Sequence, residues 1–304
     1  MIRILASDGM DKSAIAALEA KDCEVVCEFF DPEALKEAIK QFDVLVVRSA
    51  TKVREPHIDA ALETGKLRLV IRAGVGVDNI DVKYAEEKGI AVRNTPRASS
   101  NAVAELALAH MLSVARYVSV AGHTMREGKW EKKAYKGIEL AGRTVGIVGY
   151  GRIGQALGKA CQALGMQVLA YDIYQIPELE CETMRYVDMD TLLAESDIIS
   201  LHVPSLPGQP LVNADTIARM KDGVIIVNTS RGTNVDEDAL LAAIESGKVY
   251  GAGLDVFAEE PAKNAALYSH PRVSCTPHIG ASTAEAQKRI GAEIVSIISS
   301  QFNL

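Results

Sequence analysis

The sequence predicts an α/β protein built from two doubly wound parallel-sheet domains. Short β-branched apolar runs alternate with helical segments along most of the chain, and a long Ala/Leu-rich stretch separates two such series. The 304 residues are enough for two domains of common size. An apolar content of 48% and a charged content of 24% are ordinary globular values, which argues against a disordered or fibrous chain.

The first series covers residues 1–94. We expect its strands at residues 2–6, 24–28, 44–47, 69–73 and 90–93, with helices between them. Asp31-Pro32 gives one helix start, since an acidic N-cap precedes a proline in the first turn. Such alternation predicts parallel strands joined by right-handed crossovers.

Ser99 to Arg126 contains no Pro or Gly before Gly122 and predicts one long helix. Its length favours a connector between the two domains. Its apolar residues occupy more than one face, which favours packing against a second subunit. The second series then gives strands at 145–148, 167–171, 198–203, 224–228, 250–254 and 273–275. Helices are expected at 153–164, 189–195, 214–220, 237–246 and 283–300. If the last helix packs on the first domain, that domain is discontinuous, with residues 1–98 and 283–304 flanking a domain of residues 99–282.

Charge and composition restrict the partners and the compartment. The net charge of −7 and the pI near 5.5 argue against binding to nucleic acid or an acidic membrane. No stretch approaches the roughly 18 uncharged apolar residues of a membrane span, and the N-terminus lacks a leader pattern, so a cytoplasmic protein is expected. The five cysteines are scattered without CxxC spacing. They suggest neither disulfides nor a metal site, and we expect them at buried apolar positions.

The stretch TVGIVGYGRIG carries a dinucleotide-binding pattern. Gly149, Gly151 and Gly154 follow a predicted strand in GxGxxG spacing and open a helix at Arg152-Ile153. These glycines permit the turn, the approach of a pyrophosphate to the backbone, and close helix packing. The acidic residue at the end of the next strand, Asp172, lies 18 residues beyond Gly154 (172 − 154) and can bond a ribose diol. A carboxylate there repels a 2′-phosphate, which favours NAD over NADP. On its own, the glycine pattern also fits an ordinary turn.

Three later strands end in groups that can react or bind. VIIVN precedes Thr229 and Arg231, GLD ends in Asp255 and leads to Glu260, and SCTP precedes His278 and Gly280. Ligands of open α/β sheets bind outside the carboxyl ends of the strands, so these groups should converge at the cofactor edge.

Arg231, Glu260 and His278 suit the chemistry of a 2-hydroxy acid. A histidine can exchange the hydroxyl proton near neutral pH, and a neighbouring carboxylate fixes its tautomer and favours its charged form. An arginine can bond the substrate carboxylate and polarise the carbonyl. Each residue alone also fits a surface charge or a turn. Three of them at successive strand ends, downstream of a dinucleotide motif, favour catalysis.

The stretches VGYGRIG, NTSRG, GLDVFAEEP and TPHIGAST resemble the signatures of the D-isomer-specific 2-hydroxyacid dehydrogenases. The resemblance covers essentially the whole chain. It implies two Rossmann-like domains flanking a cleft, the N-terminal one discontinuous, and a homodimer formed through the long-helix region. It also implies that Arg231 binds substrate, that Glu260 and His278 form the acid/base pair, and that Asp255 lies near the nicotinamide amide.

Within that family, VVRSATKV and RAGVGVDNID most resemble the phosphoglycerate dehydrogenases. The implied reaction is oxidation of D-3-phosphoglycerate to 3-phosphohydroxypyruvate, toward serine. The substrate-binding residues it implies are Arg48, Ser49 and Lys52, with Arg72 as a further candidate for positive charge beside the phosphate, and the backbone of Gly74, Val75 and Gly76 for the carboxylate. The glycines there suit an anion-binding nest. The alternative for Lys52 and Arg48 is simple surface solvation.

Two other functions remain open at this stage. A glyoxylate or hydroxypyruvate reductase would not need Arg48 and Lys52, and a non-enzymatic NAD-sensing corepressor can use the same fold. The sequence ends at Leu304, soon after the last predicted helix. We therefore expect no serine inhibition through an appended regulatory domain.

Overall fold

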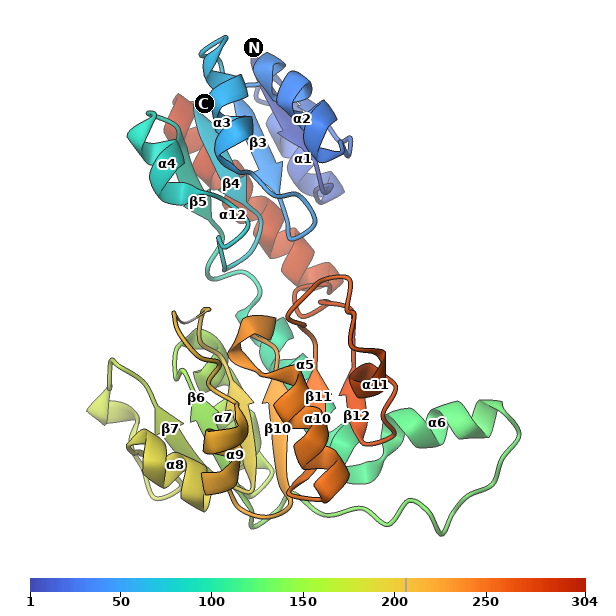
Figure 1. The fold of residues 1–304 in the computed structure, drawn as a ribbon. Helices are drawn as coiled ribbons and strands as arrows, with labels where there is room; N and C mark the ends of the chain where they lie inside the picture. Colours follow the sequence, from blue (N-terminus) through green and yellow to red (C-terminus); the bar gives the residue numbers. More distant parts are fainter. Residues whose placement is uncertain (206) are drawn as a thin grey trace. The chain divides into compact units, whose positions relative to one another are not determined.

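The computed structural model describes residues 1–205 and 207–304. The chain forms two compact units, residues 1–99 with 281–304 and residues 100–280 (Figure 1). The boundaries expected from the sequence, after residues 98 and 282, differ from these by one and two residues (99 − 98 and 282 − 280). The two-domain α/β class is confirmed.

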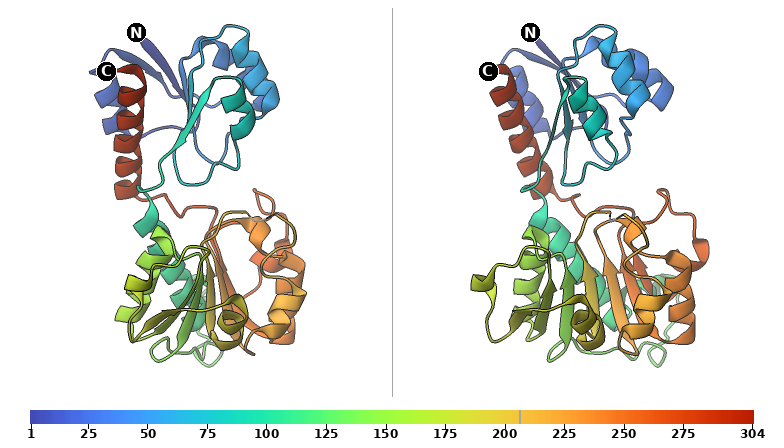
Figure 2. Two further views of the ribbon diagram at one scale, coloured as in Figure 1. Left: turned by 90° about the vertical axis from the view of Figure 1, so that its left-hand side faces the viewer. Right: turned by 60° about the vertical axis from the view of Figure 1, so that its left-hand side comes forward.

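The first unit is a five-stranded parallel sheet in the order β2-β1-β3-β4-β5. Its strands are β1 Ile2–Ala6, β2 Cys23–Val26, β3 Val44–Val47, β4 Leu69–Arg72 and β5 Ala91–Asn94. Its helices are α1 Lys12–Glu19, α2 Pro32–Ala38, α3 Glu55–Leu62, α4 Val82–Glu87 and α12 Ala284–Phe302. Figure 2 shows α12 running beside α1, and Ile290, Ile294 and Ile298 of α12 are buried with the strand residues. The chain order reverses between β1 and β3, which places a switch point there.

The second unit is a seven-stranded parallel sheet in the order β12-β11-β10-β9-β6-β7-β8. Its strands are β6 Thr144–Val148, β7 Gln167–Tyr171, β8 Met184–Tyr186, β9 Ile198–Leu201, β10 Val224–Asn228, β11 Val249–Leu254 and β12 Val273–Cys275. Its helices are α5 Ser100–Arg116, α6 Val118–Arg126, α7 Arg152–Ala163, α8 Met189–Glu195, α9 Ala214–Arg219, α10 Glu237–Ser246 and α11 Ala265–Tyr268. Two apolar clusters cover the two faces of the sheet. Chain order reverses between β6 and β9, so the glycine turn after β6 lies at a topological switch point.

The prediction of one long helix over residues 99–126 was wrong in one respect, because the segment forms two helices that meet at a 68° bend. Tyr117 adopts a left-handed conformation with φ 57° and ends α5. Its ring lies 5.9 Å from the rings of both Tyr135 and Tyr250, and these tertiary contacts favour a break that no local Gly or Pro announces. No single described helix is long and apolar enough to cross a membrane. The bent α5–α6 pair reaches the required length and composition only when its two helices are taken together.

Two further expectations need correction. The edge strand β8 was not predicted, because three residues are too few to show a period. The cysteines were expected to be buried, and only Cys23 and Cys161 are. Cys27, Cys181 and Cys275 are exposed, since they lie just after β2, in the turn before β8 and at the end of edge strand β12.

Candidate active site

The turn after β6 has the shape that a dinucleotide needs. Gly149 has φ +93°, and a Cβ atom there would fall 2.7 Å from the carbonyl oxygen of His202 at the end of β9. A Cβ atom on Gly154 would lie 2.3 Å from the carbonyl oxygen of Gly149, so α7 packs tightly on the turn. Around Gly151 there is open space, and no side chain of the described residues caps the first turn of α7, which begins at Arg152. The free N–H groups at this helix start, around Ile153, can therefore bind phosphate oxygens.

Asp172, directly after β7, is tied to this turn. Its Oδ2 accepts a hydrogen bond from the amide of Tyr150 (2.7 Å), and its Oδ1 accepts one from the amide of Tyr174 (3.0 Å). Each carboxylate oxygen keeps a further lone pair, which a ribose hydroxyl can use. The carboxylate therefore orders the glycine turn and keeps acceptor capacity for a ribose hydroxyl.

Arg231 lies in the loop after β10. Asn228 orders this loop through its side chain, which accepts from the amide and hydroxyl of Ser230 and donates to the carbonyl of Arg231. The Arg231 guanidinium donates to the carbonyl of Ser230 (2.6 Å).

A Cβ atom on Gly232 would lie 1.9 Å from the backbone of Phe257, so only glycine lets this loop contact the loop that carries Glu260. Thr229 is buried, and its hydroxyl has no partner among the described residues.

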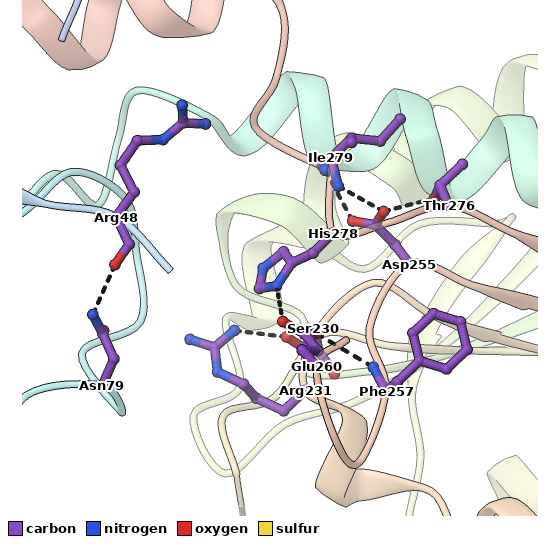
Figure 3. A network of polar contacts seen from close by, with 11 residues as sticks. Arg48, Asn79, Ser230, Arg231, Asp255, Phe257, Glu260, Thr276, His278 and Ile279 are labelled. Atoms are coloured by element: carbon purple, nitrogen blue, oxygen red, sulfur yellow. Dashed lines mark hydrogen bonds and ion pairs between the residues drawn. The ribbon is translucent and has the colours of Figure 1, made fainter. Parts of the chain in front are cut away.

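His278 and Glu260 form a hydrogen-bonded pair, with Nδ1 2.8 Å from Oε2 (Figure 3). A carboxylate only accepts, so Nδ1 carries the proton and Nε2 is left for proton exchange with a ligand. Burial acts to raise the pKa of Glu260, but the hydrogen bond and charge of His278, the Phe257 amide and the charge of Arg231 outweigh it and lower that pKa. The carboxylate is therefore ionised at neutral pH.

Asp255, at the end of β11, holds the segment that carries His278. Its Oδ1 accepts from the hydroxyl of Thr276 (2.6 Å) and the amide of Ile279 (2.8 Å), and its Oδ2 accepts from the amide of Gly280 (2.9 Å) (Figure 3). The amide of His278 donates to its carbonyl (2.8 Å). Asp255, the residue expected near the nicotinamide amide, is thus 1% exposed, and both of its carboxylate oxygens accept hydrogen bonds from the chain itself.

In the first unit, the predicted phosphate-binding segment lies just after β3, at the switch point. Asp8 fixes it, because Asp8 accepts hydrogen bonds from the amide of Arg48 (2.5 Å) and the hydroxyl of Thr51 (2.7 Å). Asn79 donates to the carbonyl of Arg48 (2.7 Å; Figure 3). Ser49 and Lys52 are exposed. Neither Arg48 nor Lys52 has an ion pair within residues 1–205 and 207–304.

The predicted carboxylate nest follows β4. Gly74 has φ +152°, its amide donates to the carbonyl of Arg72, and its carbonyl accepts from the amide of Thr95 (3.0 Å). Among the described residues, the amides of Val75 and Gly76 have no acceptor. Two adjacent open amides match the requirement of an anion nest.

The structure brings Arg231, Asp255, Glu260 and His278 together in the second unit, and Arg48, Lys52 and the Gly74 loop lie at neighbouring strand ends of the first. Sequence reasoning missed Asp8, Thr276 and His110. Thr276 stands inside the TPHIG stretch, and Asp8 follows the first strand, so both positions carried a signal. His110, a single histidine in an Ala/Leu-rich helix, carried none.

A dinucleotide-binding turn at the switch point of a seven-stranded sheet, with an imidazole–carboxylate pair at the same sheet's strand ends, defines an NAD-dependent oxidoreductase. The chain belongs to the D-isomer-specific 2-hydroxyacid dehydrogenase family. Residues 108–280 match the model of that family's NAD-binding domain. The expected NAD cofactor and oxidoreductase class are thereby confirmed.

The names of similar proteins point to different substrates. The chain is 50% identical over 307 residues to a hydroxypyruvate reductase of Thermotoga maritima, and the match covers 99% of both chains. It is 45% identical over 302 residues to the D-3-phosphoglycerate dehydrogenase of Methanocaldococcus jannaschii, covering 98% of this chain and 57% of that one. The D-lactate dehydrogenase of Aquifex aeolicus, solved with NAD and lactic acid, has a TM-score of 0.84 at 29% identity and covers 99% of this chain and 95% of that one.

Proposed function

We propose that this dehydrogenase interconverts D-3-phosphoglycerate and 3-phosphohydroxypyruvate. The observation that carries the choice is the pair of cations, Arg48 and Lys52, at the switch point of the first unit. A phosphate ester carries close to two negative charges at neutral pH. Two cations that have no ion pair among the described residues, on a segment held beside a strand end by Asp8 and Asn79, suit it. An unphosphorylated three-carbon acid leaves them without a role.

His278 exchanges a proton with the substrate oxygen during the reaction. In oxidation the hydroxyl O–H bond breaks, Nε2 of His278 takes the proton, and C2 of the substrate becomes a carbonyl carbon. Bound NAD supplies the acceptor for the hydride that leaves C2. Reduction reverses these steps, so the imidazole must then begin protonated. Glu260, ionised beside Nδ1, stabilises that imidazolium and keeps Nε2 aimed away from the pair.

Arg231 orients the substrate. Its guanidinium donates to the Ser230 carbonyl, which anchors the side chain, and the planar fork of an arginine matches the geometry of a carboxylate. Binding both the carboxylate and the C2 oxygen fixes the carbonyl and stabilises negative charge on that oxygen. In the first unit, the amides of Val75 and Gly76, which have no acceptor among the described residues, can hold a carboxylate oxygen.

Hydroxypyruvate reduction is the second candidate. It is favoured by the Thermotoga maritima relative, whose length the chain matches from end to end. Hydroxypyruvate and 3-phosphohydroxypyruvate share the carboxylate and the C2 carbonyl, so Arg231, Glu260 and His278 serve both reactions alike. The two candidates therefore differ only in what Arg48 and Lys52 bind.

Parallel assays of kcat/KM with NADH separate the candidates. We expect 3-phosphohydroxypyruvate to exceed hydroxypyruvate by about tenfold or more, since each charged hydrogen bond contributes roughly 1.5–3 kcal/mol. Arg48→Ala and Lys52→Ala should each reduce that ratio. Lys83→Ala is the matched control, because Lys83 is an exposed cation on α4 of the same unit. Equal kcat/KM for both acids in the parent excludes the phosphoglycerate proposal and leaves hydroxypyruvate reduction.

We further propose a homodimer formed through α5 and α6. None of the residues of α6 is buried within its own unit, and Val118, Met125 and the nearby Trp130 are exposed. Figure 1 shows α6 and the following segment extending from the rest of the second unit. Exposed apolar side chains on such an arm suit a second copy of the chain. Light scattering of the parent and of a Val118→Asp, Met125→Asp variant tests this: a monomeric parent contradicts the proposal.

A further inference from the structure

A buried hydrogen-bonded chain links α5 to the carboxylate of Asp255. His110 is 2% exposed. Its Nδ1 lies 3.0 Å from the hydroxyl of Ser274, and its Nε2 lies 3.0 Å from the hydroxyl of Thr276. Thr276 in turn lies 2.6 Å from Oδ1 of Asp255. The contacts therefore run from α5, through Thr276 directly after β12, to the residue that holds the His278 segment.

Each proton in this chain has one possible place. The carboxylate of Asp255 only accepts, so Thr276 uses its single hydroxyl proton there. Toward His110 the Thr276 oxygen must then accept, which places the imidazole proton on Nε2. Nδ1 is left as an acceptor and receives the hydroxyl proton of Ser274. Burial lowers the pKa of His110, with the charge of Asp255 opposing, which agrees with a neutral ring.

The sequence makes room for this contact. A Cβ atom on Gly253 of β11 would lie 2.5 Å from Cβ of His110, so α5 can approach β11 this closely only because position 253 is glycine. The imidazole then reaches past β11 to the hydroxyls of Ser274 in β12 and of Thr276 just after it. A helix at ordinary distance from the sheet would leave Thr276 with an unsatisfied acceptor.

Asp255 transmits this order to His278. Its two oxygens accept from the amides of Ile279 and Gly280, and its carbonyl accepts from the amide of His278 itself. His278 has φ +55°, a left-handed conformation that a non-glycine residue adopts only when its surroundings hold it. The backbone that aims the imidazole of His278 therefore depends on where the Asp255 carboxylate sits.

We propose that His110 is a positioning residue that acts through Thr276 and Asp255 to hold His278 in its working conformation. The inference rests on the proposed role of His278 as the proton-exchanging group. It assigns to α5 a part in the reaction that no signature stretch contains. His110 is buried and both of its ring nitrogens bond hydroxyl groups of the chain, so its effect on the reaction is transmitted by other residues.

Two substitutions of His110 separate positioning from packing. His110→Gln can place an amide donor near the position of Nε2, whereas His110→Leu keeps apolar volume and removes the donor. We expect His110→Leu to lower kcat by about tenfold to 10²-fold, with the KM for NADH little changed, because small misplacements of a catalytic group cost that much. His110→Gln should recover most of the loss. The control is Val114→Ala on the same buried face of α5, which should lower the thermal midpoint without that loss of kcat.

A kcat for His110→Leu close to that of the parent overturns the proposal. The proposal also fails if His110→Leu and His110→Gln lose kcat equally. It fails likewise if Val114→Ala loses kcat in proportion to its loss of stability, because packing alone would then explain the effect. His278→Ala is assayed in parallel. If that variant keeps its turnover, the proposed role of His278 fails, and the tautomer measurement below still decides whether the hydrogen-bonded chain exists.

Nitrogen-15 NMR of histidine-labelled parent protein at neutral pH gives that second readout. The His110 ring, assigned from its absence in His110→Gln, should show a proton on Nε2 and an unprotonated Nδ1. Thr276→Val should disturb this ring signal, and Thr276→Ser, which keeps the hydroxyl, should leave it in place. A proton on Nδ1, or an unchanged signal in Thr276→Val, overturns the proposal without reference to activity.

Discussion

The imidazole of His278 and the carboxylate of Glu260 lie 2.8 Å apart, joined from Nδ1 to Oε2. The pKa of Glu260 is held below its usual 4.5, chiefly because the hydrogen bond and charge of His278 outweigh burial. The carboxylate thus stays charged through the whole range in which an imidazole titrates.

Glu260→Gln should displace the pH profiles of the reaction toward lower pH, because a neutral amide does not stabilise an imidazolium. The reductive rate, which needs the proton on the enzyme, should fall at a lower pH than in the parent. The oxidative rate, which needs the free base, should reach its plateau at a lower pH. Initial rates in both directions across the neutral range check this. Profiles that change in height alone would mean that Glu260 orients the ring without tuning its charge.

Asp172→Ala should weaken NAD binding and raise the relative use of NADP, since a ribose acceptor and a repulsive charge are both lost. Asp172→Asn is the informative companion. The Asn oxygen can still accept from the Tyr150 amide, so the glycine turn keeps that bond, while the charge and the bond from the Tyr174 amide are lost. Titration with both cofactors should show a larger loss of NAD affinity for Ala than for Asn, and NADP gains in both. Unchanged affinities in both variants would remove Asp172 from the ribose site.

Arg231→Lys should lower kcat/KM for the oxo acid by about tenfold to 10²-fold, since a point charge replaces a planar fork. Affinity for NADH should stay near that of the parent, because the change affects the acid alone. Steady-state kinetics with fluorescence titration of NADH measure the two quantities separately. A parallel loss of NADH affinity would show that the loop after β10 has been disturbed as a whole.

His202, at the end of β9, predicts an acid-sensitive stability. Burial lowers its pKa from 6.5 to about 4. The unfolded chain therefore takes up this proton near pH 6.5, but the folded chain takes it up only near pH 4. Stability falls as pH falls between those values, by about 3 kcal/mol at most for this group.

Urea titrations at pH 7 and pH 4.5 test this expectation, with His202→Gln as the comparison. The free energy of unfolding should drop less on acidification in the variant than in the parent. His110 contributes in the same direction and is present in both proteins. Equal losses in parent and variant would mean that His202 does not stay neutral in the fold.

The parts of this molecule that depend on local sequence could be predicted. The glycine turn needs φ +93° at Gly149 and space at Gly151, and both needs select glycine at fixed spacing. The Asp31 cap also forms as expected, accepting from the amides of Glu33 and Ala34.

The remaining features depend on tertiary contacts that leave no periodic signal. The bend at Tyr117 is stabilised by rings that lie 18 and 133 residues away (135 − 117 and 250 − 117). The exposure of Cys275 follows from the edge position of β12, which the sequence of one strand does not encode. The His110 chain joins residues 164 and 166 positions apart, so only the folded structure brings them together.

The proton-exchanging role of His278 is the central claim, and the turnover of His278→Ala tests it most directly. We predict that kcat for reduction of the oxo acid falls by about 10²- to 10⁴-fold, the usual contribution of a general acid or base. NADH affinity, measured by fluorescence titration of the same protein, should be kept. A variant that binds NADH normally and turns over at the parent's rate would contradict the account.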